Sequence, residues 1–462
     1  MSQPTDPLFQ QARSFHSQGR LDEAETLYRQ LIAAQPMAAG PRHMLGVLRV
    51  QQGRNDEALE LVGAALKLNS NDAEAHANYG TILRNLKRAA EALASFDRAL
   101  ALRPDLPGPN YNRANVLLLD LNRPQEALAG YDRALAANPN FPEAWNNRGN
   151  ALTALGRLEE ALASFDHALA LRPDDIAALN CKAQALLEAG RSEEALALFR
   201  HSALLAHGSS PSPPAAEGPP HKQRHDREQR EHQATLGGKP RAGARLNGPA
   251  VTRTNHQAAE RQWQDGAPQM AVIDNLLTPE ALESLRRFCR EEPVWRRSYE
   301  NGYLGAFPET GFACPLLAQI AEELRAAFPE IFRAHPLLYV WGFKYDSTLT
   351  GINIHADEAA VNVNFWLTPD DANLDPEGGG LVVWDVAAPL DWNFAKFNAD
   401  TPAIRKFLGD AGAKKVVVPH RANRAVMFDS DLFHETDKIR FKDGYLNRRI
   451  NVTMLFGVRG KS

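Results

Sequence analysis

Small and aromatic side chains recur at a fixed spacing over residues 5–206. An alanine returns every 34 residues, with one step of 35, at Ala24, Ala58, Ala92, Ala127, Ala161 and Ala195. In five of these six repeats an aromatic residue follows four positions later, at Tyr28, Phe96, Tyr131, Phe165 and Phe199. Small residues recur upstream at Gly46, Gly80, Ala114 and Gly149. This period predicts stacked helix pairs, because one pair cannot bury its apolar face alone.

The repeats also share a closing proline, at Pro36, Pro104, Pro139 and Pro173. Together these features resemble the tetratricopeptide repeat over six consecutive units. The resemblance implies an all-α superhelix whose concave groove holds a protein or peptide partner. We interpret the single 35-residue step as an extra residue in the turn of the fourth repeat.

Asparagines line up in the first helix of successive repeats, at Asn78, Asn112 and Asn147, and again three positions later at Asn115 and Asn150. An amide both donates and accepts hydrogen bonds, so it can pair with a peptide backbone of any sequence. The ladder resembles the inner face of the superhelix in O-linked N-acetylglucosamine transferase and predicts peptide binding. The alternative is that these asparagines are solvated or satisfy nearby loops.

Residues 207–262 lack apolar periodicity. A segment rich in Pro, Ser and Gly (GSSPSPPAAEGPP) precedes a charged one (HKQRHDREQREHQ). Such a composition cannot bury a core and predicts a disordered linker. The histidines of this tract, His221, His225 and His232, are interpreted as solvated, because no rigid spacing sets them up for a metal.

Strand patterns dominate residues 263–462. First, MAVIDNLLTPEALESLRRFCREE predicts a strand and a helix that begins at a Thr-Pro pair, and PLLAQIAEELRAAF predicts a second helix. Runs rich in Val, Ile, Phe and Trp then predict strands over residues 337–345, 351–357, 360–368, 380–386, 414–419, 424–430 and 448–457. Consecutive strands indicate a mainly-β sandwich or barrel with flanking helices. Residues 386–415 are interpreted as a partly helical insertion.

Charge and cysteine usage narrow the functional classes. The 462-residue chain has a formal net charge of -4, which favours neither nucleic acid nor a membrane surface as a partner. Its three cysteines form no CxxC pair, which fits a reducing, cytoplasmic setting. No apolar run approaches the roughly 18 residues of a membrane span. The first residues also lack a basic segment followed by an apolar one, so we expect no secretory signal.

Candidate chemistry enters at His355 and Asp357. On a strand, residues two apart point to the same face. An imidazole, a carboxylate and a second imidazole form a facial triad that leaves three coordination positions open on Fe(II). A structural buried histidine, or a cupin-like site for another metal, are the alternatives. A serine hydrolase is not supported, since no G-x-S-x-G motif occurs, and the Gly run at 378–380 enters a strand rather than a helix.

The segment KYDSTLTGINIHAD, followed far downstream by DLFHETD, resembles the iron site of prolyl-hydroxylase-type 2-oxoglutarate oxygenases. The resemblance covers nearly all of residues 270–458 and implies a double-stranded β-helix, or jelly roll. It assigns His355, Asp357 and His434 as catalytic residues and metal ligands. Fe(II), 2-oxoglutarate and dioxygen are then the expected cofactor and co-substrates, with ascorbate as a further candidate.

The same resemblance places co-substrate contacts on three strands. Arg449 would pair with the outer carboxylate of 2-oxoglutarate, and the adjacent Arg448 is the alternative for this role. The further expected contacts are Tyr345, Thr453, Trp366 and Asn364.

The sequence thus predicts a 2-oxoglutarate- and Fe(II)-dependent dioxygenase that hydroxylates a protein or peptide side chain recruited by the repeats. The domains expected are residues 5–206, 207–262 and 263–462. Asp357 argues against a halogenase, because in the resembling halogenases that carboxylate is missing. Two alternatives stay open: a small-molecule hydroxylase whose repeats serve assembly, and a non-catalytic interaction scaffold.

Overall fold

The computed structural model describes residues 6–208, 219–236, 242–253, 256–332, 335–346 and 351–460. Internal contacts divide the chain into an N-terminal body, Met1–Pro173, and a C-terminal body, Asp174–Ser462. This division falls inside the range 5–206 that the sequence assigns to the repeats. Helices α11 (Ile176–Glu188) and α12 (Ser192–His207), which the period assigns to the sixth repeat, belong to the C-terminal body. There α11 contacts β4 (Leu337–Tyr345), and α12 contacts α16 (Pro315–Ala327).

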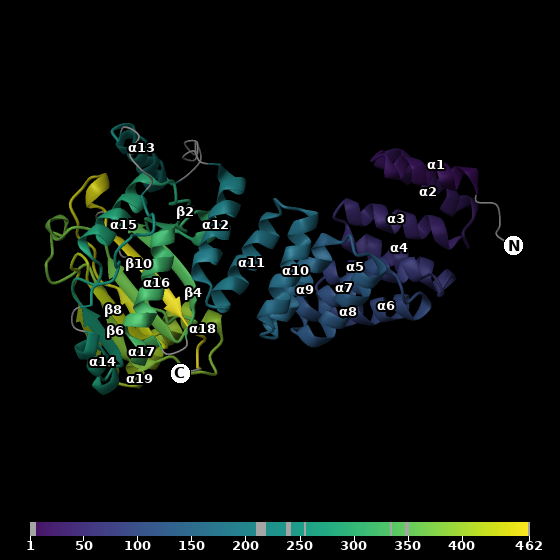
Figure 1. Ribbon diagram of the computed structural model, residues 1–462. Coiled ribbons are helices and arrows are strands. Elements are labelled where there is room, and N and C mark those ends of the chain that lie inside the picture. The colour runs from purple at the N-terminus through teal and green to yellow at the C-terminus, as the bar shows by residue number, and fades with distance from the viewer. Residues whose placement is uncertain are drawn as a thin grey trace. The chain divides into compact units, whose positions relative to one another are not determined.

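The N-terminal body is all-helical, as predicted, and Figure 1 shows its helices as successive antiparallel pairs. The pairs are α1 (Pro7–Ser17) with α2 (Leu21–Ala34), α3 (Ala39–Gln51) with α4 (Asn55–Leu68), α5 (Ala73–Asn85) with α6 (Ala89–Leu102), α7 (Pro107–Asn115) with α8 (Pro124–Ala137), and α9 (Pro142–Ala154) with α10 (Leu158–Leu171). The recurring alanines and aromatics of the second helices are buried. A Cβ on Gly149 would lie 2.5 Å from the ring of Phe165, which explains the small residue at this place in the period.

The extra residue of the fourth repeat lies inside a helix and not in the turn, where we expected it. Helix α7 continues into a five-residue π-helix, η1 (Val116–Asp120). The amide of Leu121 donates to the carbonyl of Val116, five residues back, at 3.0 Å. A π-helix absorbs one residue without shifting the flanking contacts, so Ala114 and Ala127 both keep their buried positions.

Two antiparallel sheets form the centre of the C-terminal body. The larger sheet has the order β1 (Met270–Ile273), β8 (Ala425–Asp429), β5 (Val361–Trp366), β10 (Ile450–Phe456), β4, β3 (Tyr303–Ala306) and β2 (Arg297–Ser298). The smaller sheet has the order β7 (Lys415–Val418), β6 (Leu381–Ala387) and β9 (Leu432–Thr436). Trp366 and Phe428 of the larger sheet share a buried cluster with Val383 and Leu432 of the smaller one. The core therefore lies where the two sheets face each other.

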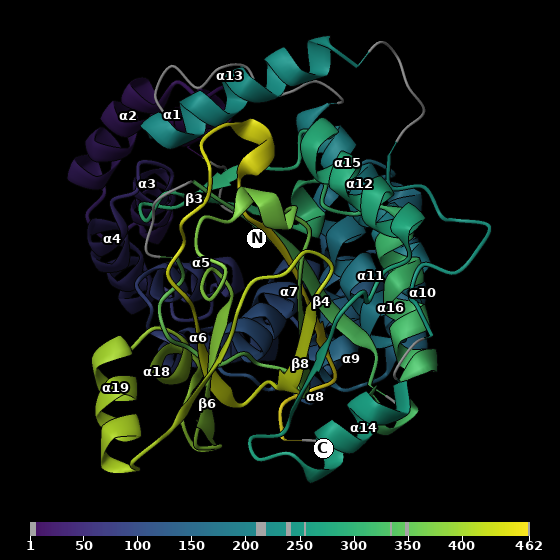
Figure 2. The same cartoon turned by 90° about the vertical axis from the view of Figure 1, so that its left-hand side faces the viewer.

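Helices flank these strands, as expected. Helix α15 (Pro279–Glu291) begins where the Thr278 hydroxyl accepts a bond from the amide of Ala281, and α16 is followed by α17 (Pro329–Phe332). Figure 2 shows α15 and α16 on one side of the strands, and α18 (Phe394–Asn398) and α19 (Thr401–Asp410) on the other. These last two helices belong to the predicted insertion. Their apolar side chains pack against Phe433, the neighbour of His434, and so support β9 from outside. No described helix is both long and apolar enough to cross a membrane.

Two local expectations were wrong. Residues 351–357 do not form a strand: only His355 pairs, in an isolated bridge with His434. The linker between residues 207 and 262 is also not wholly disordered, because it contains α13 (Pro220–Ala234) and the start of α14 (His256–Asp265). Helix α13 is held by polar contacts with α15 and with the 3-10 turn η4 (Tyr445–Asn447) rather than by an apolar face.

Candidate metal centre and its cavity

Three side chains with metal-binding atoms converge in the C-terminal body. His355 and Asp357 lie on the segment before β5, and His434 lies on β9. Backbone bonds join this segment to β9: the amide of each histidine donates to the carbonyl of the other, at 2.9 and 2.8 Å. One ligand atom from each of the three residues lies within 4.8 Å of the others. The sequence-predicted triad is thus brought together by the fold.

Hydrogen bonds fix the direction of both imidazoles. His355 Nδ1 lies 2.7 Å from the carbonyl oxygen of Asn353, and His434 Nδ1 lies 3.1 Å from that of Leu432. A carbonyl only accepts, so each Nδ1 carries the proton and each Nε2 keeps its lone pair. The Nε2 atoms point toward Asp357, at 3.8 Å from His355 and 3.4 Å from His434. This is the arrangement that a metal ligand needs.

The electrostatic surroundings of the three side chains favour the binding of a cation. Burial, and next the nearby His434, lower the pKa of His355 to about 4, so its ring is neutral at pH 7. Burial is the largest effect and raises the pKa of Asp357, but the interactions with His434, His355 and Asn362 together outweigh it, and the net pKa is lowered. The buried amide of Asn362 also donates to Asp357 Oδ2, at 2.6 Å. Two imidazoles and one carboxylate fit a divalent transition metal.

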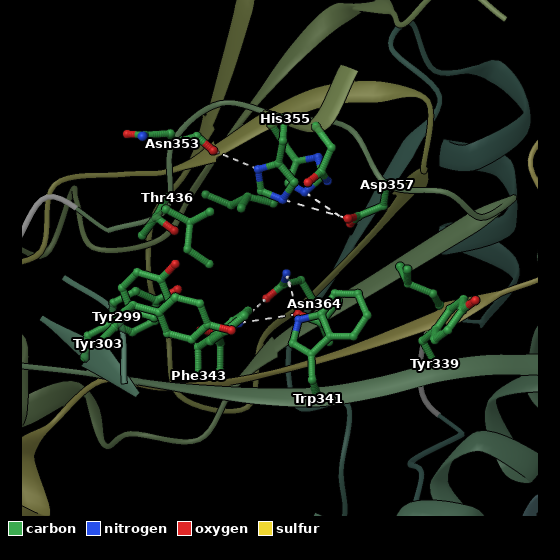
Figure 3. Close-up of a pocket in the computed structure, with 18 of the residues that line it drawn as sticks. Tyr299, Tyr303, Tyr339, Trp341, Phe343, Asn353, His355, Asp357, Asn364 and Thr436 are labelled. Carbon is green, nitrogen blue, oxygen red and sulfur yellow. Dashed lines mark hydrogen bonds and ion pairs between the residues drawn. The ribbon is translucent and has the colours of Figure 1, made fainter. Parts of the chain in front are cut away.

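A cavity of about 670 Å³ opens beside the triad, and all three ligand residues line it. In Figure 3, His355 and Asp357 lie on one side of the space, and Asn364 and Trp341 lie on the opposite side. Arg449, Tyr345, Thr453 and Asn364 also line the cavity. Four of the five sequence-predicted co-substrate residues are therefore in one place with the triad.

Arg449 is the most unusual group in this cavity, because it is only 2% exposed. Its Nε and Nη2 donate to the carbonyl oxygens of Gly379 (2.6 Å) and Gly380 (3.1 Å), and its Nη1 donates to Asn451 Oδ1 (3.1 Å). All three acceptors are neutral. Within the described residues no carboxylate forms an ion pair with this guanidinium, and Asp437 acts on it only from farther away. Burial lowers the pKa of Arg449, because removal from water disfavours the charged form.

The structure distinguishes Arg448 from Arg449, the two candidates for the carboxylate contact. Both lie just before β10, but Arg448 does not line the cavity and instead forms an ion pair with Glu228 of α13 at 2.7 Å. Trp366 does not line the cavity; its ring is buried in the core between the sheets, 5.8 Å from the Arg449 guanidinium carbon. Arg449, but not Arg448 or Trp366, is thus placed to contact a ligand.

Sequence reasoning missed the wall of the cavity opposite the metal ligands. We define this aromatic wall as Tyr299, Tyr303, Phe307, Trp341 and Phe343. Tyr299 and Tyr303 stack with ring centroids 4.5 Å apart, and Phe343 meets Tyr303 edge to face at 5.3 Å. The available signal was the alternation on β4, where residues 339, 341, 343 and 345 are all aromatic and share one face.

The asparagines of the N-terminal body are partly engaged with each other. Asn78 Nδ2 lies 2.8 Å from His43 Nε2, and Asn147 donates to Asn115 Oδ1 at 2.9 Å. Asn115 also accepts a bond from Tyr131 and is buried, whereas Asn78, Asn112, Asn147 and Asn150 are partly exposed. Asn115 therefore holds the ladder together from inside, and the other four reach its surface.

Comparisons with known proteins bear on the repeats. Family models described as tetratricopeptide repeat match residues 43–107 with 116–176, residues 164–197 and residues 8–38. Similar solved structures include MamA (19% identity, TM-score 0.33, covering 35% of this chain and 94% of MamA). PilF of Pseudomonas aeruginosa is 20% identical with a TM-score of 0.39, and the match covers 42% of this chain and 87% of PilF. YrrB, described as a TPR protein with an unusual peptide-binding site, is 25% identical with a TM-score of 0.35, and the match covers 38% of this chain and 91% of YrrB. No curated protein matches the sequence. The N-terminal part of the chain thus consists of tetratricopeptide repeats.

Proposed function

We propose that the C-terminal body is an Fe(II)- and 2-oxoglutarate-dependent dioxygenase that hydroxylates a protein or peptide side chain. One observation carries the proposal: a three-ligand metal set and a buried, unpaired guanidinium line the same cavity. A 2-oxo dicarboxylate suits both, because one end can chelate a metal while the other pairs with an arginine. The two facing antiparallel sheets support the jelly-roll fold that the sequence resemblance implies.

In this proposal His355, Asp357 and His434 hold Fe(II), and bound iron supplies the activation of dioxygen. Arg449 neutralises the outer carboxylate of 2-oxoglutarate, which in turn gives the buried guanidinium its missing counter-charge. Burial raises the pKa of Tyr345, so its phenol stays protonated and can donate to the same carboxylate. The hydroxyl of Thr453, which accepts a bond from Asn364 at 3.1 Å, offers a further donor.

The proposed reaction balances without another reductant. 2-Oxoglutarate, dioxygen and a substrate C–H bond give succinate, carbon dioxide and a C–OH group. One atom of dioxygen enters succinate and the other enters the product. Ascorbate stays a candidate for keeping the iron in its ferrous state.

The aromatic wall faces the metal ligands across the cavity, so it would contact the group that is oxidised. Its rings offer apolar faces, and the Arg297 guanidinium lies over the Phe307 ring at 4.5 Å near the exposed end. An uncharged part of a substrate would therefore be held here, while charged parts stay outside. This leaves room for a protein side chain but does not require one.

The repeats favour a macromolecular substrate over a small molecule. Tetratricopeptide repeats present a concave surface suited to peptides or partner segments, and the partly exposed amides of the ladder could bind a peptide backbone. A joint substitution of Asn78, Asn112 and Asn147 by alanine tests this. It should reduce hydroxylation of a captured protein while leaving substrate-free turnover of 2-oxoglutarate unchanged. Equal hydroxylation by the variant and the wild type would favour a small-molecule substrate, with the repeats serving assembly.

The direct test of the catalytic proposal is oxygen-dependent succinate release. Full-length protein loaded with Fe(II) and supplied with ascorbate as reductant should convert 2-oxoglutarate to succinate, and His355→Ala should abolish this conversion. His201→Ala is the matched control, because His201 is an exposed histidine of the same body, away from the cavity. Absence of succinate with the wild type, or persistence with His355→Ala, would reject the assignment. The first result would leave an interaction scaffold as the function.

A further inference from the structure

Helix α13 packs on the C-terminal body through polar side chains. Its buried residues are Lys222, His225, Asp226 and Gln229, and none of them is apolar. Lys222 pairs with Asp226 at 2.5 Å, and Gln229 donates to the carbonyl of Glu292 at 2.8 Å. A helix with such a face gains little from hydrophobic burial. Its position must therefore come from specific hydrogen bonds and ion pairs.

The contacts of α13 centre on Tyr445. The rings of His225 and His232 both lie 5.5 Å from the Tyr445 ring, between centroids. Lys344 Nζ lies over the same ring, 3.7 Å from the Tyr445 centroid. Lys344 and His225 are buried, and Lys344 Nζ and His225 Nε2 have no hydrogen-bond partner among the described residues. Burying polar groups without hydrogen-bond partners is unfavourable. A segment that served only as a linker would not need such a layer.

Two further contacts connect this layer to the cavity. Glu228 pairs with Arg448, the residue before Arg449, and Arg224 pairs with Asp346, the residue after Tyr345. The strand ends are joined directly, because the amide of Tyr345 donates to the carbonyl of Arg449 at 2.9 Å. Helix α13 therefore contacts Asp346 and Arg448 from outside the cavity. The residues next to these two, Tyr345 and Arg449, line the cavity.

We propose that Glu228 is a positioning residue for 2-oxoglutarate, acting through Arg448 on Arg449. This inference rests on the proposed function. Arg448 and Arg449 are consecutive residues just before β10, so a shift of Arg448 would also move the backbone that carries the Arg449 side chain. Arg448 is buried, and without Glu228 its remaining carboxylate partner is Asp346, 3.9 Å from its Nε, so its guanidinium would shift toward that side. That movement would displace the Arg449 guanidinium from the outer carboxylate of the co-substrate.

The test compares two charge-removing substitutions on the same helix. Glu228→Gln removes the nearer of the two carboxylate partners of Arg448, whereas Glu231→Gln removes an exposed carboxylate one turn along. Full-length proteins are loaded with Mn(II), and 2-oxoglutarate is titrated by calorimetry. Glu228→Gln should raise the Kd for 2-oxoglutarate by about tenfold or more, the size of other supporting-residue effects. Glu231→Gln should leave the Kd unchanged.

Binding of Mn(II) itself separates positioning from a loss of fold. The triad does not depend on Glu228, so the Mn(II) Kd and stoichiometry should match the wild type. If Glu228→Gln loses Mn(II) binding, Glu228→Asp decides: a weaker 2-oxoglutarate Kd supports the inference, and an unchanged Kd overturns it. Equal 2-oxoglutarate Kd values for Glu228→Gln and the wild type also overturn it. Failure of the wild type to bind 2-oxoglutarate would instead refute the proposed function.

Discussion

The amide of Asn362 should control metal affinity at the triad. This fully buried side chain donates to Asp357 Oδ2 at 2.6 Å, which holds the carboxylate with its oxygens toward the two histidines. Asn362→Leu keeps a similar volume but removes the donor. A hydrogen bond to a charged group contributes about 1.5–3 kcal/mol. Because about 1.4 kcal/mol corresponds to tenfold in an equilibrium constant, this predicts about 10- to 100-fold weaker metal binding, the range seen for groups that support metal ligands.

The assay is an anaerobic titration of the full-length protein with Fe(II), repeated with Mn(II). Asn364→Leu is the matched control, because Asn364 lies two residues along on the same face of β5 and bonds Thr453 instead of Asp357. Its metal Kd should equal that of the wild type. The reasoning fails if Asn362→Leu binds metal within about twofold of the wild type, since the hydrogen bond would then not orient the ligand.

Three other predictions follow from the same geometry. Arg449→Gln should weaken 2-oxoglutarate binding by at least about a hundredfold, since two charge-assisted bonds are lost; calorimetry should find metal binding unchanged. Gly149→Ala should destabilise the repeats by about 1–3 kcal/mol, because the added methyl group would overpack against the ring of Phe165. Gly63→Ala, whose nearest contact would be at 3.4 Å, should instead stabilise them by about 0.5–1 kcal/mol. Urea unfolding measures both changes in the free energy of unfolding. Burial, and next the charge of Arg449, lower the pKa of His420 to about 3, so the unfolded state binds more protons below about pH 6.5. Stability measured by urea should therefore fall as pH drops from 6.5 toward 4, and His420→Gln should flatten that slope; an unchanged slope would show that His420 is not buried as a neutral ring.

The repeats could be predicted closely because their signal is local. A period of 34 residues with small and aromatic positions specifies which helix faces meet, so the buried alanines and aromatics were identified from spacing alone. The π-helix at Val116–Asp120 could not be placed in this way. An extra residue can lengthen a turn or widen a helix with the same effect on the period.

Strand parity explains how much of the site was predictable. Arg449 and Thr453 are four residues apart and face one side, and both line the cavity. Parity alone could not choose between Arg448 and Arg449, because that choice depends on which face of β10 looks into the cavity. Trp366 shares the inward face, but the core between the sheets closes over it, which spacing does not reveal.

Helix α13 shows why the linker was misjudged. The prediction asked for an apolar stripe, and residues 220–234 have none, so disorder was expected. The helix is instead held by partners far away in sequence, such as Arg448 and Tyr445. Long-range polar contacts of this kind leave no periodic pattern in a single sequence.

The most direct test of the account is the fate of dioxygen. Full-length protein loaded with Fe(II) is incubated with 2-oxoglutarate under heavy-isotope dioxygen, with ascorbate supplying the electrons that the substrate C–H bond would otherwise give, and the succinate is analysed by mass spectrometry. If His355, Asp357, His434 and Arg449 bring iron and 2-oxoglutarate together as proposed, each succinate molecule should carry one oxygen atom from dioxygen. Succinate without the label, or no succinate at all, would contradict the account.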